Sequence, residues 1–265
     1  MKTGILITAR LGSTRLEKKH LLTVNKKPLI LYLVERIKNE FSDEIKNHDM
    51  QIIIATSDEQ ENRKFEDFLK FSVSVFYGSV NNIPLRHFQV AEALGLDAIV
   101  SIDGDDILCS PMGMRAIYRE LKKGVLYVKT SNLPFGMNSS GYAFSFLASA
   151  IRNNVDETLE TGWERIFDAN QLMDIAMPFS VQNDALRFTL DYEEDYQFFK
   201  ALIEVSGDSI IKMKDEEIIE IVLKNKIFSI NEQVSKKYWE NFYRFQKQEA
   251  ENSKGNSISE KGDAL

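Results

Sequence analysis

The feature that most constrains the fold of this chain is a regular alternation of short apolar runs with longer segments of helical periodicity. Ile5-Leu6-Ile7 and Ile52-Ile53-Ile54 are continuous, mostly β-branched runs, which are typical of strands buried on both faces. Between them, apolar residues recur at helical spacing from Leu29 to Ile37, directly after Pro28, which suits the start of a helix. The same alternation continues to about residue 130.

Further apolar runs predict strands at 73–76, 98–102 and 125–128, with helices at 59–70, 85–94 and 111–122. A strand–helix–strand series predicts an α/β, Rossmann-like fold: a twisted, mainly parallel sheet with helices on both faces. Such sheets bind ligands beyond the carboxyl ends of their strands, so the loops after the first four strands are the expected functional site. The residues expected in the core are Ile5, Ile7, Ile53, Val100 and Ile102.

After residue 130 the pattern changes. Helices are expected at 144–151, 157–170, 193–205 and 215–224, and a strand at 186–190 that ends in Asp191. With no internal repeat and no linker, residues 1–247 are expected to form one domain. Residues 248–265 are polar and cannot bury enough apolar area to offset ordering entropy, so a disordered tail is expected there.

Charge and composition exclude several classes of function. The net charge of the 265 residues is −7, which excludes a general nucleic-acid binder. No apolar stretch approaches the roughly 20 residues that span a bilayer, so no membrane insertion is expected. The apolar run near the N-terminus is too short for a signal peptide. Together with the single cysteine, Cys109, this predicts a cytoplasmic location.

The loop after the first strand combines small, polar and basic residues. Its small and polar members are Gly12, Ser13 and Thr14, and its basic members are Arg10, Arg15 and Lys19. Backbone amides together with forked guanidinium donors are what a polyphosphate needs. The loop matches neither the P-loop nor the dinucleotide fingerprint. A solvated basic loop is the alternative interpretation.

Carboxylates gather at two other points of the chain. Asp103, Asp105 and Asp106 follow the fourth strand, and Asp191 ends the strand expected at 186–190. Like charges this close need a cation or hydrogen-bond donors, and Mg²⁺ prefers carboxylate oxygens together with substrate phosphates. An acidic turn is the alternative. Asp195 lies at a helix start, where a capping role is favoured over metal binding.

Together these motifs resemble the cytidylyltransferase family that includes the acylneuraminate and 3-deoxy-manno-octulosonate (Kdo) cytidylyltransferases. The spore-coat polysaccharide biosynthesis branch is the most similar. Residues 9–19, 54–57, 76–79, 104–105 and 186–195 carry the resemblance, and Arg86 stands where the branch commonly has an arginine. The likeness covers about residues 3–230. It implies a nucleotidyltransferase fold of the nucleotide-diphospho-sugar transferase type and, with the unplaced segment 144–167, a homodimer.

The resemblance also implies a reaction and a set of roles. An acceptor oxygen would attack the α-phosphorus of CTP, and pyrophosphate would leave. Arg10, Arg15 and Lys19 would be the catalytic residues and would bind the β- and γ-phosphates. Asp105 and Asp191 would hold Mg²⁺. The expected nucleotide contacts are Ala9, Leu11, Gly12, Ser13, Thr14, Thr56, Ser57, Gly78, Ser79 and Arg86.

Three departures from the family pattern leave alternatives open. Glu17-Lys18 replaces a Pro-Gly pair, Asp106-Ile107-Leu108 replaces Cys-Pro-Leu, and Asn138 replaces an aspartate. The acceptor is expected to be an acidic sugar, a nonulosonic or Kdo-like acid for surface glycan synthesis. A glycosyltransferase using Asp103-Gly104-Asp105, or a non-catalytic nucleotide-binding module, are the alternatives. The aromatic stripe at 238–245 is expected to serve core or dimer packing.

Overall fold

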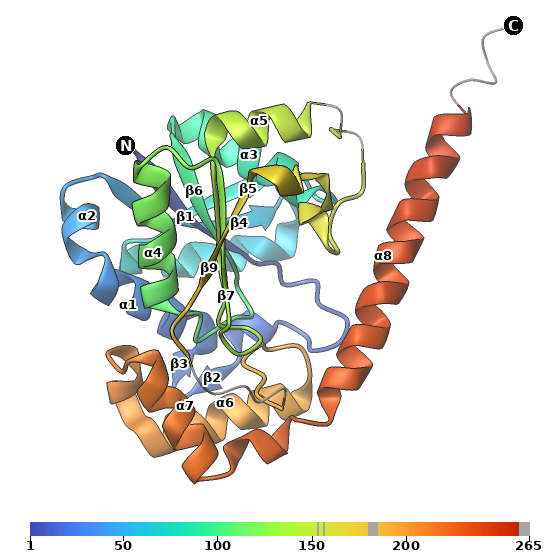
Figure 1. The fold of residues 1–265 in the computed structure, drawn as a ribbon. Coiled ribbons are helices and arrows are strands. Elements are labelled where there is room, and N and C mark those ends of the chain that lie inside the picture. The colour runs from blue at the N-terminus through green and yellow to red at the C-terminus, as the bar shows by residue number, and fades with distance from the viewer. Residues whose placement is uncertain (153, 156, 180–184, 260–265) are drawn as a thin grey trace, which may run out of the picture.

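A seven-stranded sheet organises the molecule (Figure 1). The computed structural model describes residues 1–152, 154–155, 157–179 and 185–259. The strand order is β5-β4-β1-β6-β8-β7-β9, and all neighbours are parallel except β8, which is antiparallel to both β6 and β7. The strands are β1 (Thr3–Thr8), β4 (Met50–Ser57), β5 (Ser74–Gly78), β6 (Ala98–Asp103), β7 (Tyr127–Ser131), β8 (Ser140–Ala143) and β9 (Leu172–Ala176); β2 (Thr23–Val24) and β3 (Lys27–Pro28) form a separate small hairpin.

Helices cover both faces of this sheet, as the alternation of strands and helices predicted. Ile5 and Ile7 pack with α1 and α4 on one face, whereas Leu6 points to the face covered by α3 and α5. The helices are α1 (Leu29–Glu40), α2 (Ser42–Lys46), α3 (Ile83–Leu94), α4 (Pro111–Lys122), α5 (Phe144–Ile151), α6 (Glu193–Ser206), α7 (Asp215–Lys224) and α8 (Val234–Ser259). Short 3₁₀ segments span Lys19–Leu21, Gln60–Phe71, Trp163–Ile166, Ala169–Gln171, Gly207–Ile211 and Ile227–Ile230.

The five strands predicted from apolar runs are confirmed, and so is the predicted core. Ile5, Ile7, Ile53 and Val100 are fully buried, and Ile102 is 2% exposed. The pattern missed β8, whose sequence Ser-Gly-Tyr-Ala has no apolar run. A Cβ on Gly141 would lie 2.3 Å from Ile117 Cγ2, so the glycine lets α4 approach this strand closely.

Two predicted elements differ from the structure. The helix expected at 157–170 is replaced by the two 3₁₀ turns at 163–166 and 169–171, after which β9 begins. The strand expected at 186–190 is an extended segment with one isolated bridge, between Phe135 and Arg187. Its apolar side chains Phe188 and Leu190 pack into a second core with α6 and α7 instead of joining the sheet. Asp191 therefore does not end a sheet strand.

The tail expected to be disordered from residue 248 is helical up to Ser259, while 260–265 lie outside the described residues. The helix α8 that contains it stands beside the sheet in Figure 1. Glu249 ties it to the body: its Oε1 accepts a hydrogen bond of 2.9 Å from Thr161 N, and Arg165 pairs with it over 3.3 Å. Among the described residues, no helix is both long and apolar enough to span a membrane.

We expect one buried histidine to make stability depend on pH. His87 lies between Thr8 Oγ1 (2.8 Å) and Tyr142 Oη (2.5 Å), and burial together with the Arg86 charge lowers the pKa of His87 to about 3. Because the folded state disfavours the protonated ring, stability is fully present above about pH 6.5 and falls as the pH drops toward 3. Lowering the pH from 7 to 5 should cost about 2 kcal/mol through this residue.

Urea unfolding at pH 7 and pH 5 measures this loss. His87→Gln should show a shallower dependence on pH than the parent, and the exposed His48→Gln serves as the matched control. Equal slopes in the parent and the His87 variant would contradict the assignment.

Candidate active site

A cleft lies at the carboxyl ends of β1 and β6 and has a volume of about 790 Å³. The loop after β1 forms one side, and the acidic turn after β6 forms the floor. Gly104 brings the two together: its N donates to Thr8 O over 2.8 Å, and a Cβ there would lie 2.9 Å from Ala9 Cβ. The residues of the first loop that line the cleft are Ala9, Arg10, Gly12, Ser13, Thr14, Arg15 and Lys19.

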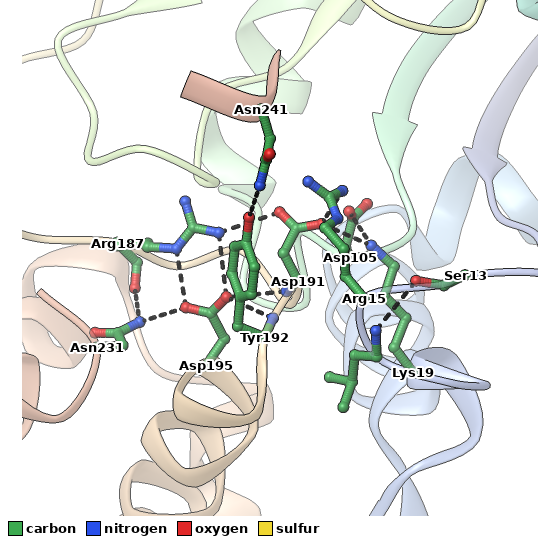
Figure 2. A network of polar contacts seen from close by, with 11 residues as sticks. Ser13, Arg15, Lys19, Asp105, Arg187, Asp191, Tyr192, Asp195, Asn231 and Asn241 are labelled. Carbon is green, nitrogen blue, oxygen red and sulfur yellow. Dashed lines mark hydrogen bonds and ion pairs between the residues drawn. The ribbon is translucent and has the colours of Figure 1, made fainter. Parts of the chain in front are cut away.

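Lys19 joins the two carboxylates that the sequence assigned to metal binding (Figure 2). Its Nζ donates to Asp105 Oδ2 over 2.5 Å and to Asp191 Oδ1 over 3.1 Å. Since both bonds end on one nitrogen, the two carboxylates converge on a single cation, as the sharing of one metal ion would also require. Burial alone would lower the pKa of Lys19, but these two carboxylates raise it above its ordinary value.

Asp191 is almost fully buried and is surrounded by three cationic side chains. Besides Lys19, Arg15 Nη2 donates to Asp191 Oδ1 over 2.6 Å and Arg187 Nη2 to Asp191 Oδ2 over 3.1 Å. The guanidinium of Arg15 also lies 5.5 Å from the ring centre of Tyr192. The buried carboxylate therefore positions two of the predicted phosphate-binding groups, Arg15 and Lys19, side by side.

Asp195 holds the segment that carries Asp191, as the predicted capping role requires. Its Oδ2 accepts hydrogen bonds of 3.0 Å from Asp191 N and Tyr192 N at the start of α6. Its Oδ1 accepts from Arg187 Nε over 2.9 Å and from Asn231 Nδ2 over 2.9 Å. The backbone also links this segment to the acidic turn, because Leu190 N donates to Asp105 O over 3.0 Å.

The carboxylates of the acidic turn differ in their pKa: burial would raise the pKa of Asp105, but the charge of Lys19 lowers it, whereas the pKa of each of its two neighbours is raised. Desolvation together with the charge of Asp105 raises the pKa of Asp103 to about 7, and the pKa of Asp106 is raised for the same reasons. Within the described part of the chain, no group of three or more His, Cys, Asp or Glu side chains is arranged to hold a metal. Two converging carboxylates nevertheless suit Mg²⁺, which takes its remaining ligands from phosphate and water oxygens.

Several predicted nucleotide contacts do not line the cleft. Thr56 and Ser57 are fully buried, and Ser57 Oγ donates to Glu59 Oε2 over 2.5 Å. The Leu11 side chain is also buried, while its N donates to Asn62 Oδ1 over 2.8 Å and so fixes the first loop. Gly78 and Ser79 lie behind Arg86, which reaches the cleft wall. The guanidinium of Arg86 donates to Ser79 O and Val80 O, so it orders that loop.

Sequence reasoning missed the opposite wall of the cleft. Arg10 Nη1 pairs with Glu160 Oε1 over 2.8 Å, and Lys129 pairs with Glu164; all four line the cleft. Glu160 lies in a loop and Glu164 in the 3₁₀ turn Trp163–Ile166, and neither follows a motif, so no sequence signal marked them. The aromatic stripe at 238–245 was expected to serve core or dimer packing. In the structure, four of its members line this cleft: Tyr238, Trp239, Phe242 and Phe245.

The fold and site define a class: a Rossmann-like nucleotidyltransferase whose basic loop and acidic turn line one cleft. A model of the cytidylyltransferase family matches residues 4–238. The chain therefore belongs to the cytidylyltransferase family, and the resemblance seen in its motifs is confirmed. It is a nucleotidyltransferase of that family.

The chain is also similar to individual relatives and to a solved structure of a cytidylyltransferase. The spore coat polysaccharide biosynthesis protein SpsF of Bacillus subtilis is 27% identical over 77% of this chain and 87% of its own. An uncharacterised protein of Methanocaldococcus jannaschii is 28% identical over 89% of this chain and 97% of its own. The structure of a cytidylyltransferase from Leptospira borgpetersenii has 25% identity and a TM-score of 0.69, covering 86% of this chain and 96% of that one.

We expect the buried charge cluster below the cleft to govern folding stability. Arg187→Met leaves Asp195 and Asp191 buried without their shared guanidinium, and breaking such a pair costs about 3–5 kcal/mol. Arg63→Met is the matched control, because Arg63 pairs with Asp58 at the surface and should cost at most about 1 kcal/mol. Equal unfolding free energies for the two variants, measured in urea, would refute this.

Proposed function

We propose that this enzyme transfers the cytidylyl group of CTP to a hydroxyl of an acidic sugar and releases pyrophosphate. The expected acceptor is a nonulosonic or Kdo-like acid used in surface glycan synthesis. One observation carries the proposal: Arg10, Arg15, Lys19 and Asp105 line one cleft, and the carboxylate of Asp191 lies buried behind its lining, bonded to Arg15 and Lys19. That arrangement suits a triphosphate and a divalent cation better than a neutral ligand.

In this mechanism the acceptor oxygen attacks the α-phosphorus in line, and the bond to the β-phosphate oxygen breaks. Phosphoryl chemistry of this kind depends on positioning and charge stabilisation rather than on a covalent nucleophile. Arg10, Arg15 and Lys19 would bind and orient the β- and γ-phosphates. Asp105 and Asp191 would hold Mg²⁺, which when bound neutralises phosphate charge and lowers the pKa of the acceptor hydroxyl.

Triphosphate binding requires an exchange of partners. Arg10 is paired with Glu160, Arg15 with Asp191, and Lys19 with both Asp105 and Asp191. Phosphate oxygens would take over these cations, and the carboxylates would then be free to bind Mg²⁺. In this structure the cationic groups therefore already lie where the phosphates are expected, and their charges are neutralised by the carboxylates with which they pair.

We also propose that the protein acts in the cytoplasm and that it forms a homodimer. The single cysteine, Cys109, is buried and free, which suits a reducing compartment. The aromatic side chain of Tyr243, which is 63% exposed and does not line the cleft, offers apolar area for a second copy. The sedimentation measurement described below also reports this assembly state.

A pyrophosphate-release screen tests the reaction directly. Four nucleoside triphosphates are crossed with acidic sugars and neutral sugar phosphates, with and without Mg²⁺. We expect CTP and an acidic sugar to react only with Mg²⁺, and Asp105→Asn to abolish release because it removes a ligand charge while keeping the shape. Asp191→Asn should abolish it as well, with some loss of stability because Asp191 lies in the buried cluster.

Release of a nucleoside diphosphate from a nucleotide sugar would indicate a glycosyltransferase instead. Binding of CTP without turnover across the whole panel would indicate a non-catalytic module. Full activity of Asp105→Asn would remove that residue from the proposed metal site.

We expect Arg10→Ala and Arg15→Ala each to weaken CTP binding by about 1.5–3 kcal/mol, because each removes a charge-assisted contact to phosphate. Calorimetric titration with CTP and Mg²⁺ measures the change. Lys18→Ala is the matched control: Lys18 belongs to the same loop, but its side chain is 40% exposed, pairs with Glu17 and does not line the cleft. CTP affinities equal to the control's in both arginine variants would show that the loop does not bind phosphate.

A further inference from the structure

One wall of the cleft is formed by aromatic side chains that have no assigned role in binding CTP. Trp239, Phe242 and Phe245 of α8 line the cleft, and Trp239 and Phe245 are each 40% exposed. Aromatic side chains that face a cavity instead of the core leave apolar surface available to a ligand. Phe242 and Phe245 also lie beyond residue 238, where the match to the family model ends.

The helix that carries this wall is held at both ends of the cleft. At its start, the rings of Tyr238 and Trp239 lie 5.1 and 5.3 Å from the ring of Phe135, and Asn241 Nδ2 donates to Tyr192 Oη over 2.9 Å. Further along, Glu249 accepts the hydrogen bond from Thr161 N. Figure 2 shows Asn241 above Tyr192, beside the Asp191 cluster. The aromatic wall is therefore fixed relative to the charged groups.

Polar atoms without partners line the same cleft. Asn138 Oδ1 and Ser139 Oγ are buried and make no hydrogen bond with any described residue. Asn138 Nδ2 donates to Leu133 O over 3.1 Å, which leaves Oδ1 as the free acceptor, and Ser139 is only 7% exposed. A buried polar atom without a partner costs free energy, so Asn138 Oδ1 indicates a ligand that supplies a hydrogen-bond donor, and Ser139 Oγ can either accept or donate a further bond.

The cationic groups on this side are already engaged. Lys129 pairs with Glu164, and Arg86 donates to backbone carbonyls. A neutral amide oxygen and a hydroxyl recognise hydroxyl or amide N–H groups, whereas a carboxylate would find no donor on Asn138 Oδ1. Aromatic rings beside such polar groups suit a ligand with one apolar face and polar edges, as a sugar ring has.

We propose, on the basis of the cytidylyl transfer proposed above, that α8 and the segment at 138–139 form the subsite that selects the acceptor. Phe242 and Trp239 would pack against the apolar face of the sugar ring, and Asn138 Oδ1 would accept a hydrogen bond from a ring hydroxyl or an N-acyl N–H. The ligand class is a hydroxylated or N-acylated sugar, and the C-terminal helix is its specificity determinant.

Intrinsic fluorescence tests this without turnover, because both tryptophans of the chain, Trp163 and Trp239, line the cleft. The full chain is titrated with N-acetylneuraminate, 3-deoxy-manno-octulosonate and N-acetylglucosamine, and separately with CTP. At least one sugar should quench saturably. Phe242→Ala and Asn138→Ala should each raise its Kd by about fivefold to tenfold and leave CTP binding unchanged.

Tyr243→Ala is the matched control, since Tyr243 is the next residue of the helix, is 63% exposed and does not line the cleft. Unchanged sugar affinity in both test variants, or no response to any sugar while CTP still binds, would overturn the subsite without touching cytidylyl transfer. The converse result, sugar binding lost in the variants but no pyrophosphate release from the parent, would uphold the subsite and defeat the proposed reaction.

Sedimentation velocity on the same variants separates the subsite from an interface. If Phe242→Ala converts a dimer to a monomer while sugar affinity stays at the parent's value, the aromatic wall is a contact between copies and the inference is wrong.

Discussion

The buried carboxylate of Asp191 is the group on which the arrangement of the cleft depends. It is 1% exposed, and Arg15, Lys19 and Arg187 all donate to it. An unpaired charge at this depth would be costly, so the three cations and the anion stabilise one another in a single geometry. Through this geometry the first loop, the acidic turn and the start of α6 are held together, although they lie far apart along the chain.

In the proposed function, this pairing would also prepare the site for a polyanion. A cation held against a carboxylate at the cleft floor is already ordered, so little side-chain entropy remains to be lost when phosphate replaces the carboxylate. In the proposed exchange, the carboxylates of Asp105 and Asp191 would be released from these cations and could hold Mg²⁺, which favours carboxylate oxygens together with phosphate oxygens. Arg10 extends the network to Glu160 and thus to the segment that binds α8 through Thr161. The nucleotide side and the aromatic side of the cleft are therefore in contact through one ion pair.

Much of this could be read from local patterns. The continuous apolar runs predicted five strands, because a strand buried on both faces needs apolar residues at every position. The basic loop was found because its position after β1 places it at the ligand-binding edge of a parallel sheet. β8 could not be predicted because its sequence, Ser-Gly-Tyr-Ala, contains no apolar run. The segment at 186–190 has the pattern of a strand because its apolar residues suit a buried extended chain, whether or not that chain joins a sheet.

The sequence by itself determined the α/β class, the core, the position of the basic loop after β1 and the cytidylyltransferase family, because these depend on periodicity and on contiguous motifs. Only the tertiary structure decided which groups meet. It brought Asp105 and Asp191 onto Lys19, buried Thr56 and Ser57 beneath the cleft, and turned the aromatic face of α8 toward the site. Those outcomes depend on pairings between residues many positions apart, and amphipathic patterning shows that a face is apolar without showing what it will cover.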